Sequence, residues 1–224
     1  ASPMARSVSG ISLLMEILSV KDPKDSTQGT HSLMKSFENL KKINPDFIKN
    51  KKIGFDPSFI DSCSSEIKKS LQLALDNFSK MGAHISEVSL PHLKHCVSVY
   101  YIIATAEASA NLARYDGIHY GFRAKKEGAN LLDTYRDSRT EGFGDEVKKR
   151  ILLGTYSLSS GYQDEYFAKA CKVRRLIFND FQNAFKNVDI LFSPVCATSA
   201  FELGKGAMDP IQMYMNDLYT IPVN

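Results

Sequence analysis

The feature that most constrains the fold is a strand–helix–strand succession between residues 52 and 90. Residues 52–55 are a short strand candidate, and residues 85–90 are another. Between them, residues 62–81 form a helical pattern whose apolar side chains share one stripe: Ile67, Leu71, Leu75 and Phe78. Gly82 follows at the position where a helix ends and positive φ is cheap for glycine. This order predicts a parallel βαβ unit.

The rest of the chain alternates helical patterns with short apolar runs, which predicts an α/β protein. Apolar periodicity predicts helices at residues 7–20, 92–114, 145–157 and 162–185, and a buried strand at 188–192. We expect the first helix to face the core through Ile11, Leu14, Met15 and Leu18. For residues 162–185 the expected core positions are Phe167, Cys171, Leu176, Phe181 and Phe185.

Three segments lack a steady period. Residues 22–50 are polar and rich in turn formers and lysine, which predicts a long surface connection. Residues 136–144 read as a polar turn region. Residues 193–200 form a loop of small residues after the predicted strand, where functional loops commonly lie in α/β proteins.

Bulk composition excludes several classes of protein. The 224 residues, 43% of them hydrophobic, suffice for one substantial core or two small ones. The net charge of +3, from 28 basic and 25 acidic residues, is too weak to indicate nucleic-acid binding. No apolar run reaches the roughly 18 residues that span a bilayer. The 4 cysteines lie in no CxxC pattern, which argues against a zinc site or a disulfide framework and favours a reducing compartment.

Familiar catalytic and metal-binding patterns are absent from the sequence. His92 and His95 lack a third ligand at suitable spacing, so surface histidines are the better interpretation and we expect no metal site. Cys196, in the loop after the predicted strand, is the least implausible cysteine nucleophile, yet a structural role is favoured. The glycines of residues 141–144 are too few for a phosphate-binding loop.

Polar residues beside apolar ones are more informative. Tyr100 and Glu107 lie along the helix predicted over 92–114. Arg150 abuts an apolar stretch, and Asp217 lies among methionine, leucine and tyrosine. Recognition of a free amino acid needs a fixed guanidinium for its carboxylate and a fixed carboxylate for its ammonium group. Periodicity does not show that these residues meet, so a core tyrosine and two ordinary surface charges remain the alternative.

Several long runs resemble the amidase-signature A subunits of tRNA-dependent amidotransferases. They are YYIIATAEASANLARYDGI at 100–118, RTEGFGDEVKKRI at 139–151, LGTY at 153–156, LSSGY at 158–162, and the short matches at 209–210, 213–214, 216–217 and 222–224. The resemblance implies an amidase-signature fold, with a central mixed sheet flanked by helices. It also implies hydrolysis of the side-chain amide of glutamine to glutamate and ammonia.

In that family a serine nucleophile is activated through a second serine by a lysine, and these residues precede the segment that residues 2–7 match. We therefore expect a single partial domain over 1–224, truncated at both ends, with no catalytic residue of its own and no activity alone. Ser2 replaces the usual glycine, and residues 193–198 lack the family's second proline, so the shape of that loop is left open.

The resemblance carries substrate recognition onto three residues of this chain. Tyr100, Arg150 and Asp217 match the glutamine-contacting tyrosine, arginine and aspartate of the family. Arg150 would bind the α-carboxylate, Asp217 the α-ammonium group, and Tyr100 would position glutamine through its hydroxyl.

The resemblance also implies partners. These are B and C subunits. The B subunit would receive the ammonia and use ATP and magnesium, and tRNA would bind mainly through the partner subunit. No cofactor or membrane contact is expected for this chain. The expected location is the cytoplasm, or a mitochondrion or plastid. Two alternatives stay open: another amidase-signature amide hydrolase, and a degenerate relative that serves as a non-catalytic interaction module.

Overall fold

The computed structural model describes residues 3–29, 36–40, 42, 44–125, 128–200, 202–203 and 216–223. It divides into two compact units, Ala1–Lys51 and Lys52–Asn224. Each unit is described by itself below. The single partial domain expected over 1–224 stays a prediction.

The described residues of the first unit form three short helical segments: α1 (Val8–Leu18), α2 (Ser36–Leu40) and the 3-10 turn η1 (Pro45–Ile48). The Ser7 hydroxyl accepts a hydrogen bond from the Gly10 amide and caps α1. The helix predicted here is confirmed. However, the core-facing role is wrong for the described residues, because Ile11, Leu14 and Leu18 are all exposed. The prediction of an irregular connection over 22–50 is also partly wrong, since α2 and η1 lie within it.

A three-stranded parallel sheet organises the second unit. Its strands are β1 (Lys52–Phe55), β2 (His84–Glu87) and β3 (Ile190–Leu191), in the order β2-β1-β3. Ile53 lies at the centre, opposite Ile85 on one side and Ile190 on the other. The predicted βαβ unit and a strand within 188–192 are thereby confirmed, but both residues of β3 are only half-buried, so the expected full burial of this strand is wrong. All strand pairs among the described residues are parallel, so the antiparallel pairing that a mixed sheet requires is not seen there.

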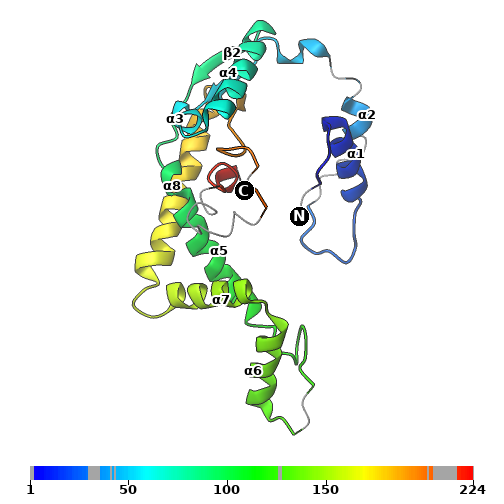
Figure 1. The fold of residues 1–224 in the computed structure, drawn as a ribbon, viewed down its shortest axis with the longest axis vertical. Helices are drawn as coiled ribbons and strands as arrows, with labels where there is room; N and C mark the ends of the chain where they lie inside the picture. The colour runs from blue at the N-terminus through cyan, green and yellow to red at the C-terminus, as the bar shows by residue number, and fades with distance from the viewer. Residues whose placement is uncertain are drawn as a thin grey trace. The chain divides into compact units, whose positions relative to one another are not determined.

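Helices make up most of the second unit (Figure 1). They are α3 (Pro57–Asp61), α4 (Ser65–Lys80), α5 (Cys96–Leu112), α6 (Leu131–Gly142), α7 (Asp145–Leu158) and α8 (Lys169–Ala184), with short turns η2 (Leu93–His95), η3 (Asp164–Ala168) and η4 (Ile221–Val223). The turn region predicted at 136–144 is wrong, because α6 covers most of it. The Asn130 side chain caps α6 by accepting from the Asp133 amide, and Arg136 pairs with Asp133 one turn on.

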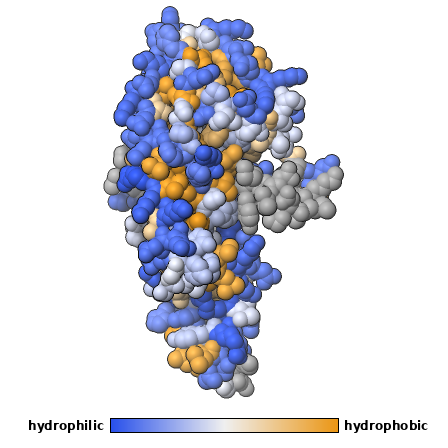
Figure 2. Space-filling model, turned by 90° about the vertical axis from the view of Figure 1, so that its left-hand side faces the viewer, coloured by the Kyte–Doolittle hydropathy of each residue, from blue (hydrophilic) through white to orange (hydrophobic). Residues whose placement is uncertain are grey.

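The core of the second unit lies where α5 packs beside α8 (Figure 1). Its buried members come from both helices and from the segment before α5: Leu90, Leu93, Cys96, Val99, Ile103, Ala170, Ile177 and Ala184. Of the core positions predicted on 162–185, Phe167, Cys171 and Phe181 do pack against this cluster. Leu176 and Phe185 are instead 42% and 49% exposed, and Ile177 takes the central position. Apolar side chains also reach the surface in patches between charged ones (Figure 2).

Two glycines mark positions where a neighbouring element approaches too closely for a side chain. A Cβ on Gly154 of α7 would collide with the carbonyl oxygen of Thr105 on α5. The hydroxyls of Ser109 and Thr155 are hydrogen-bonded across the same crossing at 2.8 Å. A Cβ on Gly54 of β1 would lie 2.8 Å from a Val88 methyl group. Only glycine allows α7 to lie this close to α5.

Candidate substrate-binding site

The three predicted substrate-binding residues come from three different elements. Tyr100 lies in the second turn of α5, Arg150 lies in the middle of α7, and Asp217 lies in the turn that precedes η4. Helix α7, which carries Arg150, packs against α5 at Gly154. The turn η4, which follows Asp217, also contacts α5.

Asp217 is brought to α5 by a neighbour of Tyr100. The Tyr101 hydroxyl donates a long hydrogen bond, 3.5 Å, to Oδ2 of Asp217. The rings of Tyr100 and Tyr101 meet edge to face, with centroids 5.1 Å apart. The amide of Ile221 donates to the carbonyl oxygen of Asp217 at 2.9 Å and closes the turn. The half-buried carboxylate is therefore held beside the helix that carries Tyr100.

Arg150 is engaged with its own helix. Its Nε donates to Oε1 of Glu146 at 3.2 Å, and the two side chains are 44% and 58% exposed. An exposed i,i+4 ion pair of this kind contributes about 0.3–0.5 kcal/mol. The guanidinium can therefore exchange this partner for another carboxylate at little cost. Among the described residues, no hydrogen bond or ion pair joins Arg150 to Tyr100 or Asp217. The geometry thus brings Tyr100 and Asp217 near each other through Tyr101 and leaves Arg150 apart.

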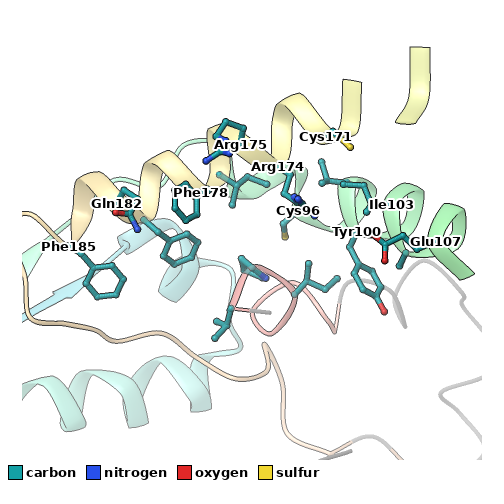
Figure 3. Close-up of a pocket in the computed structure, with 17 residues that line it drawn as sticks. Cys96, Tyr100, Ile103, Glu107, Cys171, Arg174, Arg175, Phe178, Gln182 and Phe185 are labelled. Atoms are coloured by element: carbon teal, nitrogen blue, oxygen red, sulfur yellow. The ribbon is translucent and has the colours of Figure 1, made fainter. Parts of the chain in front are cut away.

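A cavity of about 830 Å³ opens between α5, α8 and η4 (Figure 3). Tyr100 and Glu107 line it from α5, while Arg174 and Gln182 line it from α8. The remaining wall is largely apolar and includes Phe178, Phe181 and Phe185. Neither Arg150 nor Asp217 lines this cavity. Its charged groups therefore differ from the pair that the resemblance assigns to glutamine.

The Cys96 thiol beside this cavity is a poor nucleophile. Burial raises the pKa of the Cys96 thiol, whose sulfur lies 3.5 Å from the carbonyl oxygen of Leu218. Cys96 is 2% exposed and packs in the core. Cys196 is exposed, in the loop after β3. Nothing in the described geometry supplies it with a base.

His92, one of the two histidines considered for a metal site, is bound to a carboxylate of α8. The amide and ring Nδ1 of His92 both lie within 3.0 Å of the carboxylate of Asp180, a buried residue of α8. His92 thus fastens the start of η2 to α8. Among the described residues, no group of three or more histidine, cysteine, aspartate or glutamate side chains is arranged to hold a metal ion.

Sequence reasoning missed two tyrosines that support the site. Tyr101 bonds to Asp217, and Tyr219 anchors the turn that carries it. Tyr219 belongs to the same apolar stretch as Asp217, but its burial depends on residues 57–63, which are remote in the sequence. The helical pattern of residues 92–114 does not single out Tyr101, because its role depends on the position of Asp217, which the sequence does not give.

Comparison with known proteins gives the class. The amidase family profile matches residues 1–224, and the chain belongs to the amidase family. Similarity to solved structures agrees: a bacterial aryl acylamidase of the amidase-signature family superposes with a TM-score of 0.59 at 21% identity over 88% of this chain and 36% of that one, which shows the shared fold.

Within the family, the chain is most informatively compared with the A subunits of glutamyl-tRNA(Gln) amidotransferases. It is 48% identical over its whole length to the A subunit from Zymomonas mobilis, and 47% identical over 99% of its length to that of Geotalea daltonii. The crystal structure of the corresponding A subunit from Thermotoga maritima superposes with a TM-score of 0.67 at 28% identity, covering 99% of this chain and 42% of that one. The resemblance inferred from the sequence is confirmed.

The chain spans 45% of the length of the two curated relatives. The partial coverage expected from the sequence agrees with this. In the part of the chain that the structure describes, no helix has the length and apolarity to cross a membrane.

Proposed function

We propose that the full-length protein containing this chain is the glutamine-hydrolysing A subunit of a tRNA-dependent amidotransferase. What carries the proposal is the identity of 44–48% over essentially the whole chain to proteins named as that subunit. The reaction converts glutamine and water to glutamate and ammonia, and the ammonia then serves to amidate glutamyl-tRNA.

In this proposal the chain contributes substrate recognition. The guanidinium of Arg150 exchanges its exposed partner Glu146 for the α-carboxylate of glutamine. The carboxylate of Asp217, held beside α5 by Tyr101, accepts the α-ammonium group. Tyr100 offers its hydroxyl from the neighbouring position on α5. Two charge-assisted contacts to the same zwitterion explain a preference for a free amino acid over a simple amide.

Catalysis and partners follow the same proposal. The nucleophilic serine and its activating lysine belong to a part of the family's sequence outside this chain. B and C subunits receive the ammonia, and ATP, magnesium and tRNA bind there. These assignments, the absence of a cofactor in this chain, and a cytoplasmic or organellar location stay predictions.

The experiment is a glutaminase assay on the full-length protein with Arg150→Ala and Asp217→Ala. Each variant should lose on the order of 2–4 kcal/mol of transition-state binding, about 30- to 1000-fold in kcat/KM, because a charge-assisted contact is removed. The matched control is Arg136→Ala, which removes an exposed arginine whose ion-pair partners among the described residues, Asp133 and Asp137, both lie in α6. Near-normal kcat/KM in both test variants would refute the site. A panel of simple amides separates this proposal from another amide hydrolase, because that enzyme would not prefer glutamine.

A further inference from the structure

The turn that carries Asp217 is anchored by a buried tyrosine. Tyr219 is 2% exposed, and its ring meets that of Phe59 on α3 edge to face, with centroids 5.3 Å apart. An aromatic pair in this geometry is favourable beyond the area it buries. The backbone two residues after Asp217 is therefore fixed to a helix more than 150 positions earlier in the sequence.

The hydroxyl of Tyr219 completes the anchor. It lies 2.7 Å from Oγ of Ser62, and Ser62 in turn donates to the carbonyl oxygen of Phe59 at 2.8 Å. Because a serine hydroxyl has a single proton and a carbonyl oxygen can only accept, Tyr219 donates and Ser62 accepts. The other neighbours of this hydroxyl, the Phe59 carbonyl and the Cys63 sulfur, lie farther away, at 3.4 and 3.5 Å.

The turn is held on its other side as well. The Cys96 thiol donates to the carbonyl oxygen of Leu218 at 3.5 Å, and the amide of Ile221 donates to that of Asp217 at 2.9 Å. The two residues that follow Asp217 are thus held by a contact of Leu218 to α5 and by the Tyr219 anchor on α3. Among the described residues, the carboxylate itself is contacted by the Tyr101 hydroxyl, at the long distance of 3.5 Å. The placement of this carboxylate consequently depends on its backbone.

The anchor keeps one protonation state at ordinary pH. Burial, followed by the Cys63 thiol, raises the pKa of Tyr219 to about 12. The phenol is neutral and able to donate throughout the range in which an enzyme of this class would be assayed.

We propose that Tyr219 is a positioning residue for glutamine: through its hydrogen bond to Ser62 it sets the place of Asp217, and so the affinity for the α-ammonium group. This inference rests on the proposed function, because it assigns a role within that binding site. It makes residues 59–62 of the α3 region determinants of substrate affinity although they do not touch the substrate.

The test is Tyr219→Phe in the full-length protein, which keeps the ring and removes the hydroxyl. KM for glutamine should rise about fivefold, the equivalent of one lost hydrogen bond, while kcat stays within about twofold. Tyr120→Phe is the control, because Tyr120 is 60% exposed and its hydroxyl makes no hydrogen bond to any described residue. A merely structural role would lower kcat and the melting temperature together and would not produce this split.

Two further variants test the route. Ser62→Ala should raise KM at least as much as Tyr219→Phe, because it leaves the buried hydroxyl with only its longer contacts, and the double variant should lose no more than Ser62→Ala alone. In an Asp217→Asn background, Tyr219→Phe should have no further effect on KM.

The outcomes are distinguishable. If the wild-type full-length protein hydrolyses glutamine and Tyr219→Phe leaves KM unchanged, or still raises KM about fivefold in the Asp217→Asn background, this inference is overturned and the proposed function stands. If the wild type does not hydrolyse glutamine at all, the proposed function fails and this inference falls with it.

Discussion

Helices α1 and α8 carry similar apolar periodicity but have different surroundings. In α8, Ile177 is 6% exposed and packs in the core beside α5. In α1, Ile17 and Leu18 are 61% and 65% exposed, and the one buried residue is Ser12. A helical period predicts the helix in both cases, yet it does not say whether a partner covers the apolar face. The stability of α8 comes from packing in the core, whereas α1 contacts α2 and leaves most of its apolar side chains exposed.

The largest expected effect is at the close crossing in the second unit. Gly154→Val should destabilise the protein by more than about 3 kcal/mol, because any Cβ meets the backbone carbonyl of Thr105 and neither backbone can move freely. Urea denaturation of the full-length protein measures the change. Gly29→Ala in the first unit is the matched control, since a Cβ there meets nothing within 4 Å and should change stability by less than about 0.5 kcal/mol. Equal effects in the two variants would contradict the close approach.

The next prediction compares two isoleucines directly. Ile177→Ala should cost about 3 kcal/mol through lost burial and a residual cavity. Ile17→Ala should cost less than about 0.5 kcal/mol in the 224-residue chain, because its side chain is already exposed. Thermal unfolding of both variants gives the difference. A large cost for Ile17→Ala in the full-length protein would show that residues outside this chain cover α1.

Alkaline pH should act on the second unit through Tyr219. Its folded pKa, about 12, lies above the ordinary value of 10.0, so the contribution to stability is complete below pH 10 and is lost as the pH rises towards 12. The first unit, residues 1–51, contains no tyrosine, so its stability cannot depend on pH through a phenol. Ultraviolet titration of phenolate, with Tyr219→Phe as the comparison, measures it. The pKa of Tyr156, beside Tyr162, is also raised to about 12, so one late-titrating phenolate should remain in Tyr219→Phe. Loss of a late-titrating phenolate in Tyr120→Phe instead would contradict the assignment.

The smallest expected effect concerns helix caps. Ser7→Ala removes the side chain that accepts from the Gly10 amide, at a cost of about 1 kcal/mol to α1. Since most apolar side chains of α1 are exposed, we expect local fraying, seen as faster hydrogen exchange in residues 8–18 with an unchanged global transition. Ser64→Ala, the equivalent cap of the better packed α4, should instead lower global stability. Protection of α1 unaffected by Ser7→Ala would show that something other than the cap holds it.

Local signals in the sequence were reliable where the chain's own chemistry decides the outcome. The βαβ unit was predictable because strand-forming runs flank an amphipathic helix that ends at Gly82, whose φ is indeed positive. Helix α6 was missed because its residues are polar and it buries only Ser138, so its apolar period is weak. Its signal lay in the Asn130 cap and the Asp133–Arg136 pair, which a search for apolar period does not detect.

In the candidate site, too, the residues could be named from the sequence but their contacts could not. Tyr100, Arg150 and Asp217 could be named from their residue types and from long matching runs, and their roles in glutamine binding stay predictions. The contacts that position them could not be named. Tyr101 reaches Asp217 and Tyr219 reaches Ser62 across sequence separations of 116 and 157 residues, and no local pattern encodes such pairs.

The sequence by itself determined the family and most of the second unit's helices and strands, because long family-like runs, helix caps and apolar periods are properties of neighbouring residues. Only the tertiary structure decided which apolar faces are buried, how closely α7 approaches α5 at Gly154, and which side chains hold the turn of Asp217. Those outcomes depend on atoms that are distant along the chain and meet only after folding, so their energies cannot be assigned from local spacing.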